Sequence, residues 1–294
     1  MNGWQPGWLS DRGVVGVSGV VEGGVAQSLT SGAVGWPAVL ASMSLVLLAL
    51  VLARWLRLRI ERELVEASLR AAGQLLLVGL VFAFIFGSAH AIWWSWLWVV
   101  VMATAATVVV VRRAGHRIRG LPLVTAAAIV GTSLLSIAVT FGFGVVAHDP
   151  VSVVVVAGIT IGNAVPSAVL GVNLSVASCR DRVGSLEALL SLGFDRREIV
   201  RFMAPRTARA SVIPQVERTK VVGLIALPGA MTGLLLAGVE PVEAVVVQLL
   251  VMYLILGSAT VCVLASVVTV TRSAVSPGLQ IEDWVRDPPD HGDD

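Results

Sequence analysis

The sequence predicts an all-α integral membrane protein with about seven transmembrane helices. Of its 294 residues, 56% are hydrophobic and 14% are charged, and the mean hydropathy is +0.87. A soluble domain usually carries about 25% charged residues. The apolar residues gather in seven stretches that contain no Asp, Glu, Lys or Arg. These stretches are residues 37–53, 71–89, 92–111, 121–146, 151–177, 221–239 and 244–271.

Each stretch is expected to cross the membrane as a helix. About 20 apolar residues are needed to span a hydrocarbon core of roughly 30 Å. Hydrocarbon has no water to satisfy backbone groups, so each segment must form its own hydrogen bonds, as a helix does. The sequence therefore places a transmembrane domain at residues 36–272.

The two ends of the chain differ in composition from this domain. Residues 1–35 are rich in glycine, and their single basic residue is Arg12. A cleavable signal peptide would need a basic start and an unbroken apolar run, so we expect a mobile extracytoplasmic tail instead. Residues 273–294 carry six acidic groups. This segment is expected to be a cytoplasmic tail without folded structure.

The basic residues set the expected orientation. All of the 21 Lys and Arg residues except Arg12 follow the first, third, fifth or seventh stretch, and so lie on one side of the membrane. By the positive-inside rule that side is cytoplasmic. We therefore predict a multi-pass protein of the cell membrane, with its N-terminus outside and its C-terminus in the cytoplasm.

Proline and glycine interrupt two stretches near their middle. Pro228 lies about 12 Å along the helix axis from Lys220, and Gly162 lies about 18 Å from Pro150, so both are expected near mid-membrane. Interrupted helices can turn backbone groups toward a cavity, but glycine and proline also occur in ordinary helix packing, and the residues alone do not decide between the two. The candidate residues of a transport pathway are Gly162, Asn163, Pro166, Pro228, Gly229, Met231, Gly233 and Gln248.

The longest loop, residues 179–213, is expected to form helix, turn at Gly193 and helix on the cytoplasmic side. Apolar and charged residues alternate there at helical spacing, which could suit lipid headgroups or a soluble partner. The mixture of acidic and basic residues favours a protein partner. A second, shorter amphipathic segment is expected at residues 55–70. Glu217, Arg218 and Lys220 are placed at the inner mouth of the sixth stretch, where they could gate a pathway or anchor the helix at the headgroups.

Several short motifs occur in a characteristic order between Gly158 and Leu256. They are Ile161-Gly162-Asn163-Ala164, Glu187-Ala188 with Gly193 six residues on, Ile213-Pro214, the run VGLIALPGAMTG from Val222 to Gly233, Leu236-Ala237-Gly238, Pro241, Ala244 and Gln248. In this order the chain resembles the FetB-type iron-export ABC transporter permease family, which also contains aluminium-tolerance permeases.

The resemblance implies an ABC transporter subunit that exports iron or a related metal cation. It also implies a homodimer of permeases that works with a cytosolic ABC ATPase subunit. In such transporters the cytoplasmic Glu-Ala stretch followed by glycine forms coupling helices that dock on the ATPase. The residues that match this role are Glu187, Ala188, Gly193, Arg196 and Arg197.

Other functions find less support in the residues. No phosphate-binding loop is present, so ATP must be hydrolysed by a separate subunit, and no motif of an intramembrane enzyme is found. We expect no cofactor, no catalytic residue and no nucleic-acid partner. The alternative is an ion-coupled secondary transporter or channel. Such proteins usually keep an ionisable residue within the membrane, and the seven stretches have none.

An exported cation would need oxygen, nitrogen or sulfur ligands. Few such groups occur inside the stretches. The candidates for attracting or releasing a metal at the outer mouth are His148, Asp149, Glu240 and Glu243.

Overall fold

A computed structural model describes residues 36–57, 60–113, 118–144 and 146–286. Within these ranges every regular element is a helix, and pairing between extended residues is limited to two isolated β-bridges. The expected all-α class is confirmed. The helices are α3 (Trp36–Trp55), α4 (Glu61–Phe86), α5 (Ala91–Arg113), α6 (Leu121–Gly142), α7 (Pro150–Asp181), α8 (Val183–Ser191), α9 (Arg196–Val221), α10 (Gly229–Leu236), α11 (Pro241–Ser273) and α12 (Asp283–Arg286).

Five helices are long and apolar enough to cross a membrane, namely α4, α5, α6, α7 and α11, and α3 contributes a shorter apolar segment. These six helices coincide with six of the seven predicted stretches. The amphipathic segment expected at residues 55–70 is not separate, because residues 61–70 are the first turns of α4. The expected tail at residues 1–35 lies outside the described residues.

The expectation of one kinked helix over residues 221–239 is wrong. Helix α9 runs from Arg196 to Val221, a turn follows, and α10 is only eight residues long. Gly223 has a φ of +90° in this turn, a conformation that residues with a Cβ rarely adopt. Pro166, in contrast, does not interrupt α7, which stays helical on both sides of it.

The described chain divides into two compact units, which we treat separately. One contains the chain up to Ala91 together with Gly233–Val239, and in it α3 contacts α4. The other contains Ile92–Thr232 and the chain from Glu240 onward. All sites considered below lie in this second unit.

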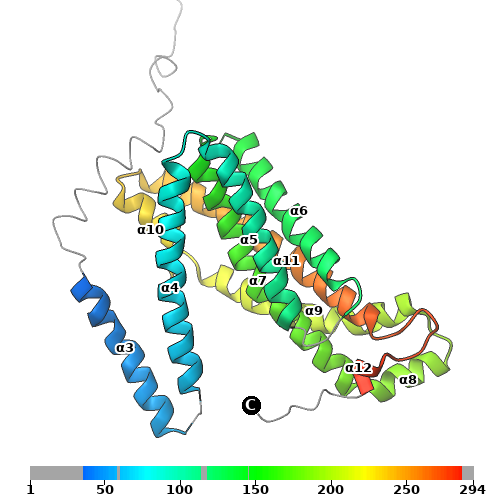
Figure 1. The fold of residues 1–294 in the computed structure, drawn as a ribbon. Helices are drawn as coiled ribbons and strands as arrows, with labels where there is room; N and C mark the ends of the chain where they lie inside the picture. Colours follow the sequence, from blue (N-terminus) through cyan, green and yellow to red (C-terminus); the bar gives the residue numbers. More distant parts are fainter. Residues whose placement is uncertain (1–35, 58–59, 114–117, 145, 287–294) are drawn as a thin grey trace, which may run out of the picture. The chain divides into compact units, whose positions relative to one another are not determined.

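The second unit is a helical bundle organised around α7 and α11 (Figure 1). Helix α11 contacts α6, α7 and α9, and α7 also contacts α6 and α9. Helix α7 lies close to α11 at Gly171, where an added Cβ would lie 3.3 Å from Cγ2 of Val267. Glycine therefore allows these two long helices to pack closely against each other.

The chain beyond α11 is folded onto the same unit. Ala274, Val275, Ile281 and Val285 are buried in a cluster with residues of α7, α8 and α9. This corrects the expectation of an unfolded tail for residues 274–286. The physical reason is that these four apolar side chains can all be buried together, whereas most of the acidic residues that suggested a tail lie beyond Arg286.

Candidate functional site

A cavity of about 390 Å³ lies where the chain breaks between α9 and α10. Its walls come from α7, the end of α9, the turn at residues 222–228, the start of α10, and α11. Most of the lining is apolar. The polar side chains that line it are those of Asn163, Gln215, Arg218 and Gln248.

The turn at residues 222–228 is built by local hydrogen bonds. The N–H groups of Ile225 and Ala226 donate to the carbonyl of Val221, at 3.1 and 3.3 Å, and the Gly223 N–H donates to the carbonyl of Ala226 at 2.9 Å. Pro228 follows and has no N–H to continue a helix. The break therefore leaves the start of α10 facing the cavity instead of extending α9.

Arg218 reaches across to α7. Its Nη1 donates a hydrogen bond of 3.0 Å to Oδ1 of Asn163, while Nδ2 of Asn163 donates to the Ile159 carbonyl within α7 at 2.8 Å. Asn163 lies thirteen residues after Pro150, or about 20 Å along the α7 axis. The sequence placed Asn163 near mid-membrane and Arg218 at the inner mouth, yet the structure brings them into contact.

Gln248 fixes the start of α10 against α11. Its side chain is buried, and its Oε1 accepts a hydrogen bond of 3.2 Å from the backbone N–H of Met231. The first N–H groups of a helix have no partner within the helix, so a side-chain acceptor from a neighbour stabilises this end. The position of α10 is thus tied to α11.

The cavity presents mainly hydrogen-bond donors. Gln215 is 7% exposed, and its Nε2 has no partner among the residues that the structure describes. The guanidinium of Arg218 adds a full positive charge, and the N-terminal end of α10 adds a partial positive charge. None of the lining side chains is Asp, Glu, His or Cys. This chemistry suits a ligand with acceptor oxygens better than a bare cation, which prefers carboxylate, imidazole or thiolate ligands.

The expected pathway residues divide into three groups. Asn163, Pro228, Gly229 and Gln248 line the cavity, and Met231 adjoins it through its bond to Gln248. Gly162 and Pro166 are exposed on α7 and are not part of the lining. Gly233 belongs to the other compact unit.

Of the three residues expected at the inner mouth, only Arg218 lines the cavity. Glu217 and Lys220 are exposed and pair with each other at 2.8 Å. Sequence reasoning missed Gln215, although its position three residues before Arg218 puts both side chains on one face of α9. This three-residue spacing is the sequence signal that could have identified Gln215 as a neighbour of Arg218.

The expected helix, turn and helix of the cytoplasmic loop is present as α8, Gly193 and α9. Gly193 has a φ of +84°, and Asp195 and Glu198 form reciprocal capping hydrogen bonds at the start of α9. Leu192 and Phe194 are exposed on either side of Gly193. We refer to Leu192, Gly193 and Phe194 as the loop tip.

The residues expected to couple to an ATPase lie around this tip. Glu187 forms a 3.0 Å ion pair with Arg286 of α12, and Arg196 donates to the Arg272 carbonyl at 2.8 Å. Ala188 and Arg197 are exposed. The sequence does not predict the pairing of Glu187 with the C-terminal segment, because the composition of that segment predicts an unfolded tail.

The candidate metal ligands are not gathered into a site. In the described part of the chain there is no group of three or more His, Cys, Asp or Glu side chains that could hold a metal. Asp149 caps α7 by accepting a 2.7 Å hydrogen bond from the Ser152 N–H, and the ring of His148 meets that of Phe141 edge-on. Glu240 and Glu243 are exposed at the start of α11.

Comparison with known proteins places the chain among membrane proteins. Residues 36–275 match the family described as uncharacterised protein family UPF0014. The chain is 33% identical over 249 residues to UPF0014 membrane protein STAR2 of Oryza sativa subsp. japonica, covering 83% of this chain and 85% of the relative.

Two further relatives carry functional names. Protein ALUMINUM SENSITIVE 3 of Arabidopsis thaliana is 30% identical over 83% of this chain and 89% of its own length. Probable iron export permease protein FetB of Escherichia coli strain K12 is 29% identical over 74% of this chain and 84% of its own length. No solved structure matches the chain.

Proposed function

The chain belongs to the UPF0014 family of membrane proteins, and from this premise we propose that it is the membrane-spanning subunit of an ABC transporter. In this proposal a separate cytosolic subunit hydrolyses ATP, two copies of the permease pair with each other, and the cargo is iron or a related metal moved outward. The cavity between α7, α9, α10 and α11 would be part of the transport pathway.

The loop tip carries the proposed coupling. Leu192 and Phe194 are exposed apolar side chains at the end of a rigid helical hairpin, and an exposed apolar tip of this kind suits a groove on a protein partner. Because α9 is a single helix from Arg196, next to this tip, to Val221, and stays helical through Pro205 and Pro214, a push on the tip would be transmitted along it to the cavity. This continuity is the observation that carries the proposal.

The break between α9 and α10 supports a moving part at the cavity. Irregular backbone at membrane depth is tolerated where it lines a cavity, and transporters often bind substrates at such breaks. The hydrogen bond from Met231 to Gln248 and that from Arg218 to Asn163 would hold the cavity closed on two sides. A displacement of α9 would act directly on the second of these bonds.

The name of the Escherichia coli relative supports iron as the cargo. The cavity's chemistry favours a metal that travels with oxygen-bearing ligands, because its side chains offer donors to such ligands and no carboxylate to the metal itself.

A secondary transporter or channel is a second candidate, and one observation favours it. Arg218 contacts Asn163 at a point about 20 Å along the α7 axis from Pro150. The guanidinium of Arg218 is thus an ionisable group at a depth where the apolar stretches themselves contain no ionisable residue. A charge at this depth could serve as a counter-ion in ion-coupled transport.

The test reconstitutes the full chain in vesicles with and without the ABC ATPase subunit of its host. We expect movement of iron only with both the ATPase and ATP. Leu192→Asp should weaken retention of the ATPase at least tenfold, because it places a charge in the proposed contact. Leu69→Asp, which changes a leucine outside the tip of similar exposure (68% against 74% for Leu192), is the matched control. Iron movement in vesicles that lack the ATPase would refute the proposal and support the second candidate.

A further inference from the structure

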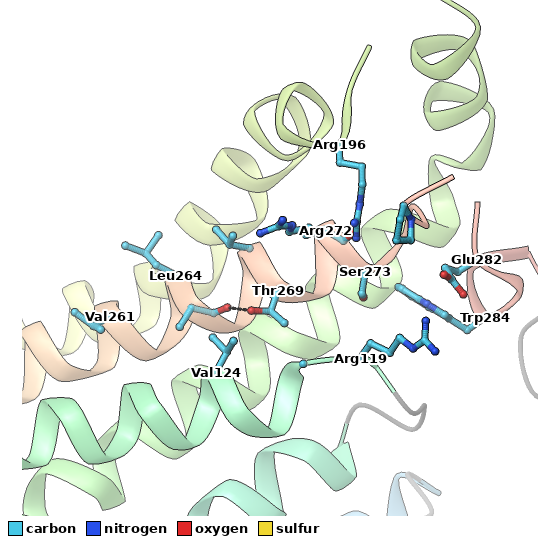
Figure 2. Close-up of a pocket in the computed structure, with 14 residues that line it drawn as sticks. Arg119, Val124, Arg196, Val261, Leu264, Thr269, Arg272, Ser273, Glu282 and Trp284 are labelled. Carbon is cyan, nitrogen blue, oxygen red and sulfur yellow. Dashed lines mark hydrogen bonds between the residues drawn. The ribbon is translucent and has the colours of Figure 1, made fainter. Parts of the chain in front are cut away.

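A second cavity, of about 860 Å³, lies outside the transport pathway. It is formed by the start of α6, the C-terminal half of α11, the start of α9 and the segment that leads to α12. Figure 2 shows Val261 and Leu264 toward one end, and Arg119, Glu282 and Trp284 toward the other. The two ends therefore differ in chemistry.

Three arginines line the polar end. Arg119 directly precedes α6, Arg196 begins α9, and Arg272 lies in the last turn of α11. Among the residues that the structure describes, no carboxylate lies within 4.0 Å of any of these guanidinium groups. Glu282 is the single acidic residue of the lining, so the net charge of the lining is +2.

Arg196 adds a specific donor to this end. Its Nη2 donates to the Arg272 carbonyl at 2.8 Å, whereas its Nε is buried and has no partner in the described part of the chain. A buried unpartnered N–H of a charged group is costly unless a ligand accepts its hydrogen bond. The polar end thus has both charge and an available donor for an anion.

The other end of the cavity is an apolar trough that faces outward. Val261, Leu264 and Val268 of α11 and Val124 of α6 line it, and each is between 36% and 47% exposed. The distance along α11 from Val261 to Arg272 is eleven residues, or about 16 Å. One leaflet of a hydrocarbon core of roughly 30 Å has nearly this thickness.

We propose that this cavity binds an anionic phospholipid. The phosphate would lie among Arg119, Arg196 and Arg272, and an acyl chain would follow the trough from Val268 toward Val261. The arginine-rich side is the cytoplasmic one by the positive-inside rule, and anionic lipids of that leaflet are attracted by basic residues. Trp284 at the same end is a residue type typical of the headgroup level.

The proposal assigns the lipid a structural role that is independent of the proposed transport function. Arg196 begins the helix that follows the loop tip, whereas Arg119 and Arg272 belong to the ends of α6 and α11. A phosphate that bridges the three would join α9 to the membrane helices. Stability of the bundle should therefore depend on the charge of the surrounding lipid.

The experiment measures thermal unfolding of the purified full chain in detergent, titrated with phosphatidylglycerol or with phosphatidylcholine of the same acyl chains. We expect saturable stabilisation by phosphatidylglycerol only. The variant Arg119→Gln/Arg272→Gln should bind it about 30-fold more weakly, because two basic contacts are lost. Arg196 is left unchanged, since it also supports the packing of α9. Arg112→Gln/Arg113→Gln, which removes two exposed arginines from the end of α5, should bind as the wild type does.

Three results would overturn the proposal. Equal stabilisation by phosphatidylcholine would mean that the arginines contribute nothing. Equal stabilisation by inorganic phosphate alone would mean that the site takes a free anion and that the trough is not used. Stabilisation by phosphatidylglycerol only after removal of residues 287–294, which are rich in aspartate, would mean that the acidic end of the chain occupies the site. In the supporting case Leu264→Gln weakens binding of phosphatidylglycerol as well.

Discussion

The contact between Arg218 and Asn163 can be tested by a double-mutant cycle. Arg218→Ala, Asn163→Ala and the double variant are compared with the wild type for their free energy of unfolding. Asn163→Ala also removes the hydrogen bond from Asn163 to the Ile159 carbonyl. That loss occurs both with and without Arg218, so it cancels in the coupling energy.

The expected coupling follows from the geometry of the bond. The distance from Nη1 to Oδ1 is 3.0 Å, which is within the usual range for a good hydrogen bond. Hydrogen bonds between transmembrane helices average about 0.6 kcal/mol and reach about 1.7 kcal/mol. A charged donor strengthens the bond, but Arg218 is exposed, which weakens it. We expect about 1 kcal/mol of coupling, which corresponds to about 2–3 °C in melting temperature.

The assay is thermal unfolding in detergent, with a second cycle as control. Glu217 and Lys220 form a 2.8 Å pair whose side chains are 59% and 63% exposed, and their coupling should stay below about 0.5 kcal/mol. Arg218→Lys should recover only part of the coupling, since lysine lacks the planar guanidinium. If the effects of Arg218→Ala and Asn163→Ala simply add, or if the control cycle gives an equal coupling, the contact does not stabilise the protein.

Two glycines allow further tests by the same measurement. Gly171→Leu should destabilise the protein by about 1–3 kcal/mol, because the leucine side chain would meet Val267 of α11. Gly131→Leu is the control and should not destabilise the protein, because no neighbouring atom lies within 4 Å of a Cβ at that position. Equal effects of the two variants would contradict the close approach of α7 to α11. Gly193→Ala should lower the free energy of unfolding by about 1–2 kcal/mol, because the φ of +84° at Gly193 is unfavourable for a residue with a Cβ. Gly184→Ala within α8 is the control and should be neutral or stabilising. If Gly193→Ala leaves stability unchanged, the turn has another conformation.

The sequence alone was sufficient for six of the seven apolar helices and for the hairpin formed by α8, Gly193 and α9. Long apolar runs dictate helices because hydrocarbon leaves backbone groups no other partner, and six of the predicted stretches are helices, although α4 begins ten residues before its predicted stretch. Gly193 marked the turn between α8 and α9 for an equally local reason, because only glycine adopts its backbone conformation without strain.

Local signals were not sufficient where hydropathy and packing disagree. Residues 221–239 are as apolar as a membrane span, yet Gly223 and Pro228 end α9 and leave α10 short. Residues 273–294 taken together look like an acidic tail by composition, yet four buried side chains hold residues 274–286 against α7, α8 and α9. In both cases a few residues outweigh the average over the segment.

Which distant residues meet depends on how the helices pack against one another. Arg218 bonds to Asn163, 55 positions away, because α9 packs along α7 in one particular register. Arg119, Arg196 and Arg272 line one cavity because the starts of α6 and α9 lie near the end of α11. The sequence determines which face of each helix is apolar. The rotation and offset of one helix against another depend instead on how residues such as Gly171 and Val267 fit together. No pattern within a single helix encodes that fit.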